Sequence, residues 1–146
     1  MTLTLDSLNR ASPADFARAV GDTFELAPWV AENAAALRPF ATVTALHEAM
    51  IGQVRAAPRD QQLAFLRGHP DLAGKAARAG DLTDDSKKEQ ASVGLDSLNE
   101  EEFARFHRLN DAYQAKFGFP FIVCVRRHTR DSILDQFERR LRHDAA

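Results

Sequence analysis

The sequence predicts an all-α protein of about seven helices with one short extended segment near Phe121–Val125. Apolar residues recur at spacings of three and four along almost the whole chain, which is the periodicity of amphipathic helices. Helix start and stop residues divide that pattern into segments. Only the stretch FPFIVCV is β-branched and aromatic like a strand, and no second strand is available to pair with it. We therefore expect an isolated extended segment packed between helices.

Three helices are expected before Pro58. Ser12 caps the first and Pro13 opens it, the second ends before Pro39, and Pro58 breaks the third. Their expected inward residues are, in order, Phe16 and Val20; Leu26, Trp29, Val30 and Leu37; and Val43, Leu46, Met50 and Val54.

A short helix through Leu63 and Leu66 is expected to stop at Gly68, a favourable residue for a helix C-terminus, and to deliver the chain to His69. Because Pro70 disfavours helical geometry at the residue before it, His69 is expected in an extended conformation where it can face a cleft. On the residues alone, two readings stay open: a functional role for this histidine, or a local structural role at the helix end. The remaining histidines are expected at the surface.

The polar stretch from Lys75 to Asp85 is expected to be a surface loop, and Ser86 to start the next helix. Ser86 and Glu89 have the spacing of a capping box, in which each side chain accepts a hydrogen bond from the other residue's backbone amide. The same geometry leaves first-turn amides, near Lys87 and Lys88, able to bind a carboxylate or oxyanion. Capping and ligand binding are therefore compatible here.

The longest periodic run ends at Gly118 and Pro120, and a last helix is expected from Arg130 to His143. Their expected inward residues are Phe103, Phe106, Asn110, Tyr113 and Phe117 in the first, and Ile133, Leu134, Phe137 and Leu141 in the second. Between them, the unpaired backbone of the FIVCV segment can present donors and acceptors to a flat heterocycle that carries ureido and amide groups. Cys124 is expected to be a small buried hydrophobe and not a nucleophile.

Composition narrows the possible partners. A formal charge of −2 and a pI near 6.2 leave no basic field for phosphate backbones, so nucleic acid is not expected as a partner. No apolar run is long enough to span a membrane, so no membrane association is expected. A single cysteine excludes an internal disulfide, no metal-ligand spacing is present, and the reducing cytoplasm is the expected compartment. The length of 146 residues fits one domain, 1–146.

Five ordered blocks make the chain similar to the 2-oxo-4-hydroxy-4-carboxy-5-ureidoimidazoline decarboxylase family. The blocks lie between about Ser7 and Leu141, and they are RPF, HPDLAGK, SKKEQASVGLDSL, FHRLNDAYQAKFGFPFIVCVR and ILDQFERRL. The resemblance implies an all-α fold, a homodimer, and a lyase that acts in urate degradation without a metal or organic cofactor. It implies the removal of the substrate's C4 carboxylate and a stereospecific protonation, which yield (S)-allantoin and CO2.

Carried onto matching positions, the resemblance implies that His69 is the catalytic acid or base and that Pro70 shapes the pocket. Ser86, Glu89 and Gln90 are expected to contact the substrate from the start of their helix, with Glu89 also orienting the imidazole. Backbone donors near Lys87 and Lys88 would stabilise developing negative charge. The backbone of Phe121, Ile122, Val123, Cys124 and Val125 is expected to hold the ring and the ureido group.

In one respect the sequence differs from the family. Members usually continue into another helix that brings an arginine to the substrate, whereas this sequence ends at Ala146. Either the sequence is trimmed or the protein lacks that group, and the chain as it stands is expected to bind allantoin weakly and to turn over slowly. The alternative function is a non-catalytic helical binding module that retains the fold and the pocket.

Overall fold

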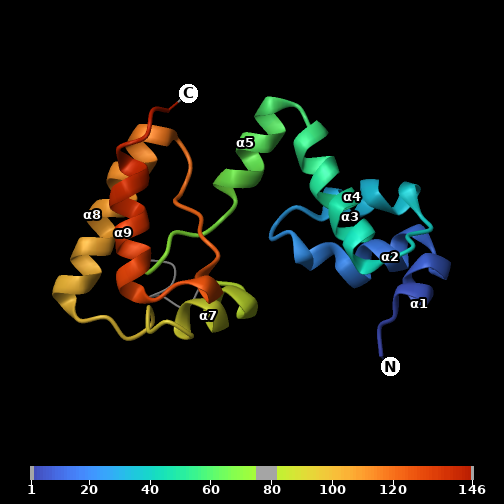
Figure 1. Cartoon of the computed structure of the whole chain (residues 1–146), viewed down its shortest axis with the longest axis horizontal. Coiled ribbons are helices and arrows are strands. Elements are labelled where there is room, and N and C mark those ends of the chain that lie inside the picture. The colour runs from blue at the N-terminus through green and yellow to red at the C-terminus, as the bar shows by residue number, and fades with distance from the viewer. Residues whose placement is uncertain (1, 75–81, 146) are drawn as a thin grey trace. The chain divides into compact units, whose positions relative to one another are not determined.

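The computed structural model describes residues 2–74 and 82–145. It divides the chain into two compact units, Met1–Gly68 and His69–Ala146, and the boundary falls directly before His69 (Figure 1). The assignment of residues 1–146 to one domain stays a prediction. Most of the expected polar loop, residues 75–81, lies outside the described residues.

The all-α fold class is confirmed, because the described residues form eight α-helices, three short 3-10 helices (η) and no strand. Unit 1 holds α1 (Leu5–Arg10), α2 (Pro13–Val20), η1 (Gly21–Thr23), α3 (Pro28–Ala34), η2 (Ala35–Leu37), α4 (Val43–Ala56) and α5 (Arg59–Arg67). Unit 2 holds α7 (Asp84–Ala91), α8 (Glu100–Phe117), η3 (Val125–Arg127) and α9 (Arg130–Leu141).

Unit 1 is built around α2, α3 and α4, whose buried residues include Phe16, Val30 and Met50 as expected. The RPF motif has a structural role there. Arg38 donates hydrogen bonds to the carbonyl oxygens of Leu8 (3.1 Å), Ala11 (2.6 Å) and Ala35 (2.8 Å). Its guanidinium also lies 4.9 Å from the centre of the Phe16 ring. One arginine thus joins α1, the α1–α2 turn and η2.

Three expected inward residues of unit 1 are exposed. Leu26, which is 72% exposed, precedes the helix that Pro28 opens and has a left-handed backbone with φ of 55°. Leu37 is exposed because the α-helix ends at Ala34 and the tighter 3-10 turn changes the side-chain period. Val43 is exposed at the first position of α4, directly after the Thr42 cap. Helix α1, capped by Thr4, has no counterpart among the expected elements.

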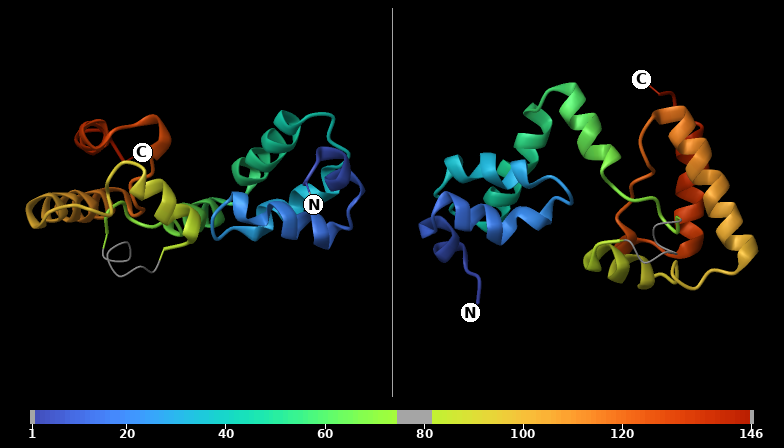
Figure 2. Two further views of the ribbon diagram at one scale, coloured as in Figure 1. Left: turned by 90° about the horizontal axis from the view of Figure 1, so that it is seen from below. Right: turned by 180° about the vertical axis from the view of Figure 1, so that it is seen from behind.

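In unit 2, α8 and α9 pack side by side and run in the same direction, because the extended segment between them returns along the pair (Figures 1 and 2). Asn99 caps α8 together with Glu102, and Gly118 ends it in the left-handed conformation with φ of 74°. Phe106 and Tyr113 of α8 are buried as expected, and so are the α9 residues Ile133, Leu134 and Phe137. The last helix of the prediction is therefore confirmed in its start and inward face, but it ends at Leu141, two residues before the expected end at His143.

The expected extended segment is confirmed between α8 and α9. Residues 121–124 make no strand, and Phe121 is stacked on Phe137 with ring centres 3.8 Å apart. Phe121 and Val125 are buried, whereas Cys124 is exposed. The expectation of a buried cysteine was wrong, because Cys124 lies where the extended chain turns into η3 and directs its side chain outward.

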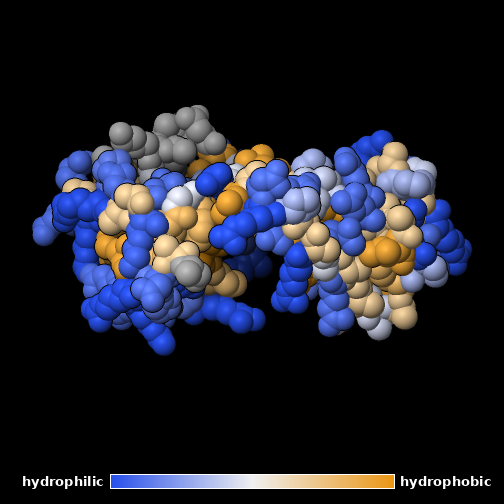
Figure 3. Space-filling model, turned by 90° about the horizontal axis from the view of Figure 1, so that it is seen from above, coloured by the Kyte–Doolittle hydropathy of each residue, from blue (hydrophilic) through white to orange (hydrophobic). Residues whose placement is uncertain are grey.

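The surface is largely hydrophilic where the described residues can be seen. On the face in Figure 3, polar and charged side chains separate the apolar surface into patches. No helix among residues 2–74 and 82–145 is long and apolar enough to cross a membrane.

Candidate active site

All site residues expected from the sequence belong to unit 2. His69 and Pro70 are both half-buried and follow α5, whose last amide, that of Gly68, donates to the carbonyl of Ala64 at 3.0 Å. Gly68 adopts a right-handed conformation with φ of −71°, so α5 ends without the left-handed turn that glycine favours. Helix α5 thus ends before His69, as the stop signals predicted, and the histidine is the first residue of unit 2.

The next four residues form a tight and mostly buried loop, residues 71–74. Ala73 has a left-handed backbone with φ of 50°, which is uncommon for a residue other than glycine. Gly74 cannot carry a side chain without movement, because a Cβ atom there would lie 2.9 Å from the Cβ of Asp71. This compact turn explains the small residues in HPDLAG.

Helix α7 starts earlier than predicted. Its N-cap is Thr83, whose hydroxyl accepts a hydrogen bond from the amide of Ser86 at 3.3 Å, and Asp84 and Asp85 occupy the first turn. Ser86 is therefore the third helical residue, and the expected Ser86–Glu89 capping box was wrong. Threonine is a good N-cap, and two carboxylates suit the positive end of the helix dipole.

This shift also removes the expected oxyanion donor. The amide of Lys87 donates to the carbonyl of Thr83 at 2.9 Å, so it belongs to the helix ladder and does not point out of the helix end. Lys88 lies one residue further into α7, and both lysines are exposed. Any contact that these lysines make with a ligand must come from their side chains.

Glu89 and Gln90 point in different directions from α7. The Glu89 carboxylate, with 46% of its side chain exposed, lies 3.6 Å from Nε of Arg126 in η3. Gln90 is 4% exposed, and its side chain bonds the backbone of the 71–74 loop. An exposed ion pair of this length contributes little to stability. It does place Glu89 next to the segment that contains the expected substrate platform.

Some backbone groups of that platform are already occupied. The carbonyl of Ile122 accepts a hydrogen bond from Nη1 of Arg140 at 2.6 Å, and the Arg140 guanidinium lies 4.8 Å from the centre of the Phe121 ring. The carbonyls of Cys124 and Val125 accept from the amides of Arg127 and His128, both at 3.0 Å. Within the described residues, the amides of Ile122 and Val123 make no hydrogen bond. The backbone groups of this segment that remain for a ligand are therefore mainly amide donors, and fewer are carbonyl acceptors.

Helix α7 connects the three expected parts of the site. Through Gln90 it holds the loop that follows His69, and through Glu89 and its packing against η3 it meets the extended segment. The structure thereby brings together residues that are far apart in sequence. It combines in one compact unit an imidazole, a carboxylate and amides that make no hydrogen bond to the described residues. Within the described residues, no three His, Cys, Asp or Glu side chains form a cluster that could hold a metal ion.

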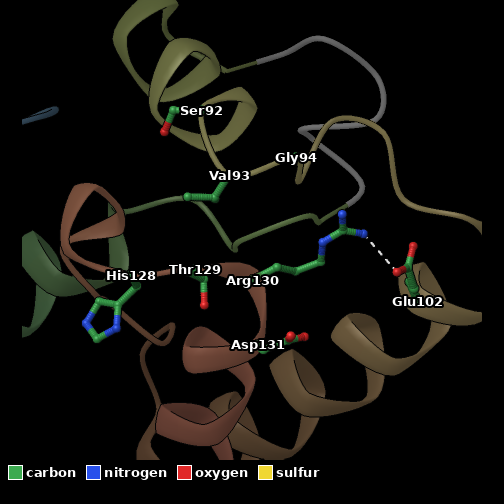
Figure 4. A pocket seen from close by; sticks show the side chains of 8 residues that line it. All are labelled: Ser92, Val93, Gly94, Glu102, His128, Thr129, Arg130 and Asp131. Carbon is green, nitrogen blue, oxygen red and sulfur yellow. Dashed lines mark hydrogen bonds and ion pairs between the residues drawn. The ribbon is translucent and has the colours of Figure 1, made fainter.

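Two pockets of unit 2 lie at this helix. A pocket of about 360 Å³ is lined by Lys87, Lys88 and Gln90 of the expected set, together with Leu82, Ala91, Leu95 and Asp96. A wider and more polar pocket of about 740 Å³ lies beyond the end of α7 (Figure 4). Its lining residues, which the sequence did not indicate, are Ser92, Val93, Gly94, Glu102, His128, Thr129, Arg130 and Asp131.

An ion pair of 2.8 Å between Arg130 and Glu102 crosses this wider pocket from α9 to α8 (Figure 4). His128 is held through Nδ1, which lies 3.0 Å from the hydroxyl oxygen of Ser132. Two of the charged groups that line the pocket, Arg130 and Glu102, are thus paired with each other. Neither pocket is lined by His69 or Glu89, the two residues expected to be catalytic.

A helical fold with an imidazole, a carboxylate and unpaired amides on adjoining segments is suited to a lyase that moves protons without a redox step. Comparison with known proteins narrows this class. The family model described as OHCU decarboxylase matches residues 9–146. The chain therefore belongs to the OHCU (2-oxo-4-hydroxy-4-carboxy-5-ureidoimidazoline) decarboxylase family.

Individual relatives agree with this assignment. A Haloferax volcanii protein named 2-oxo-4-hydroxy-4-carboxy-5-ureidoimidazoline decarboxylase is 43% identical over 141 residues, which cover 97% of this chain and 82% of that protein. The Bacillus subtilis protein named Uric acid degradation bifunctional protein PucL is 40% identical over 130 residues, 89% of this chain and 26% of that protein. A crystal structure of (S)-allantoin synthase superposes with a TM-score of 0.73 at 30% identity, and it covers 98% of this chain and 46% of that chain.

Proposed function

We propose that this chain decarboxylates 2-oxo-4-hydroxy-4-carboxy-5-ureidoimidazoline to (S)-allantoin and CO2 as a step of urate degradation. The observation that carries the proposal is the family match over residues 9–146. The name of the Bacillus subtilis relative supports the pathway, and the name of the solved neighbour supports the product. In the reaction the bond to the carboxylate breaks, CO2 leaves, and a ring carbon takes up a proton on one face.

We assign the proton transfers to His69. Imidazole is the side chain whose ordinary pKa lies nearest to neutral pH, so it can both accept and donate a proton during turnover. The position of His69 supports the assignment, because α5 has ended and Pro70 excludes the residue from a helix. Pro70 is expected to shape the pocket beside the histidine.

Glu89 is the expected partner of the histidine and the substrate. Its carboxylate is half-exposed beside Arg126, so it is accessible to orient a ligand. Arg126 forms an ion pair with this carboxylate, and its guanidinium suits the carboxylate or the ureido carbonyl of the substrate. Ser86, one turn before Glu89, is expected to offer its hydroxyl group.

Negative charge develops on the substrate when CO2 leaves, so donors placed at that position are expected to supply much of the rate. The amides of Ile122 and Val123, which make no hydrogen bond within the described residues, are the candidates. The apolar and stacked surroundings of Phe121 hold this backbone in place before a ligand arrives. Val123 to Val125 complete the platform that is expected to hold the ring.

We further propose that the reaction needs no metal or organic cofactor, that the protein is a cytoplasmic homodimer, and that nucleic acid and membranes are not partners. The proposal of a cofactor-free reaction rests on the chemistry, since breaking the bond to the carboxylate and protonating carbon require only acid–base groups and charge stabilisation. Activity that survives dialysis against a chelator tests the independence from a metal, and the mass of the protein in solution tests the homodimer.

The decisive experiment supplies freshly generated substrate to the purified chain and follows (S)-allantoin by circular dichroism. We expect the optical signal to develop faster than in a matched solution without protein, and to depend linearly on protein concentration. Formation of racemic allantoin at the spontaneous rate would contradict the proposal. Ligand binding without conversion would favour a non-catalytic binding module instead.

A further inference from the structure

Two buried amide side chains converge on the backbone that follows His69. Gln90, which is 4% exposed, and Asn110, which is 2% exposed, are the buried polar side chains of the described residues. One belongs to α7 and the other to α8, and the two residues are 20 positions apart in the sequence. Both side chains nevertheless bond the same short loop, residues 71–73.

The bonds involve each residue of the loop in turn. Nε2 of Gln90 donates to the carbonyl of Asp71 at 3.4 Å, and Oε1 of Gln90 accepts from the amide of Ala73 at 2.8 Å. Between these two, Nδ2 of Asn110 donates to the carbonyl of Leu72 at 2.9 Å. The loop backbone is therefore fixed from two helices at three consecutive residues.

Core stability alone does not account for Asn110. Its Oδ1 is buried and makes no hydrogen bond within the described residues, and such an unsatisfied group offsets the gain from the bond that Nδ2 makes. Buried polar groups of this kind can specify one backbone arrangement in place of adding to stability. The arrangement specified here includes the left-handed backbone of Ala73, which the loop sequence does not favour by itself.

We infer that Gln90 and Asn110 are positioning residues, which set the backbone of residues 71–73 and thereby orient His69. The connection is short, because only Pro70 separates the hydrogen-bonded loop from His69. The proline ring also fixes the backbone φ of Pro70. The inference rests on the proposed role of His69, and it gives Gln90 a role through the loop in addition to the expected contact with the substrate.

The test follows the His69 side chain directly, so it does not depend on turnover. In full-length protein with isotope-labelled histidine, the His69 signals are assigned with a His69→Asn variant. Asn110→Leu and Gln90→Met then remove the loop bonds at similar side-chain volume, and Ile133→Val serves as the control. Ile133 is fully buried in the same unit but makes no side-chain hydrogen bond.

We expect the His69 ring signals to shift in Asn110→Leu and Gln90→Met and to stay in place in Ile133→Val. In the decarboxylation assay of Asn110→Leu, which lies outside the expected substrate contacts, kcat is expected to fall by about 10-fold to 10²-fold with little change in KM, the scale of a catalytic group displaced by about 1 Å. The inference would be overturned if the His69 signals also shifted in Ile133→Val, and if the shift in each of the three variants only followed the decrease in its thermal midpoint. If the ring signals shift in the variants as expected but the parent protein shows no turnover, the result counts against the proposed function only. The ring signals still report the position of His69.

If the two variants do not fold, amide hydrogen exchange in the parent protein decides the question. The amide of Ala73 donates to a buried side-chain oxygen, so it is expected to exchange slowly, like the amides inside α8. Exchange at the rate of an exposed loop amide would show that the loop is not held by Gln90, and would overturn the inference.

Discussion

Replacement of Arg140 by methionine tests how the substrate platform is held. The guanidinium donates a 2.6 Å hydrogen bond to the carbonyl of Ile122 and lies over the ring of Phe121. A hydrogen bond to a charged group is worth about 1.5–3 kcal/mol, and a cation–π contact about 0.5–1 kcal/mol at an exposed site. Because Arg140 is only half-buried, we expect the low end of the sum, about 2 kcal/mol.

In a chain of this length, a loss of about 2 kcal/mol lowers the thermal midpoint by roughly 4–8 °C. The platform loses its anchor as well, so KM for the ureidoimidazoline is expected to rise more than kcat falls. Thermal unfolding by circular dichroism and steady-state allantoin formation measure the two effects. The kinetic constants are determined well below the midpoint of the variant, where the protein is folded.

Arg139→Met is the matched control. Arg139 is the preceding residue of α9, its side chain is exposed, and it makes no side-chain hydrogen bond or ion pair within the described residues. The substitution removes the same charge from the same helix, and we expect stability and KM close to those of the parent. Equal effects of the two substitutions would refute the reasoning, because net charge and not the Ile122 bond would then be responsible.

Three further predictions concern the acid–base groups and the helix cap. His69→Asn is expected to lower kcat by about 10²-fold or more at an unchanged thermal midpoint, and a variant that unfolds would favour a structural role for the histidine. Glu89→Gln is expected to reduce turnover strongly at nearly constant stability, since its ion pair with Arg126 is exposed; normal turnover would show that this carboxylate is dispensable. Thr83→Ala is expected to cost about 0.5–2 kcal/mol in chemical denaturation, and Ser86→Ala less, because Thr83 is the N-cap; the reverse order would restore the original cap assignment.

Local sequence signals predicted the helices of unit 2 well. Gly118 and Pro120 end α8 where the structure ends it, because a left-handed turn after a helix needs glycine and proline cannot continue the ladder. The inward faces of α8 and α9 follow from apolar periodicity alone. The same reasoning was wrong for Leu26 and Leu37, because the helix between them is shorter than the periodic run that suggested it.

Helix caps were harder to assign, because more than one side chain could serve. Ser86 and Glu89 have the spacing of a capping box, but Thr83 three residues earlier uses its own hydroxyl for the amide of Ser86. Both choices satisfy a first-turn donor, and local sequence does not rank them. The consequence reaches the site, because the position of the cap decides which amides of α7 are already bonded.

The sequence by itself determined the all-α class, the interruption of helices at His69 and the single extended segment, because periodicity, glycine and proline act through local backbone geometry. The resemblance carried by its five blocks pointed to the family, which the comparisons confirmed. Only the tertiary structure showed that Gln90 and Asn110 meet on one loop and that Arg140 occupies the carbonyl of Ile122. These contacts join residues 17, 38 and 18 positions apart, and such pairings depend on how helices pack, which no local pattern encodes.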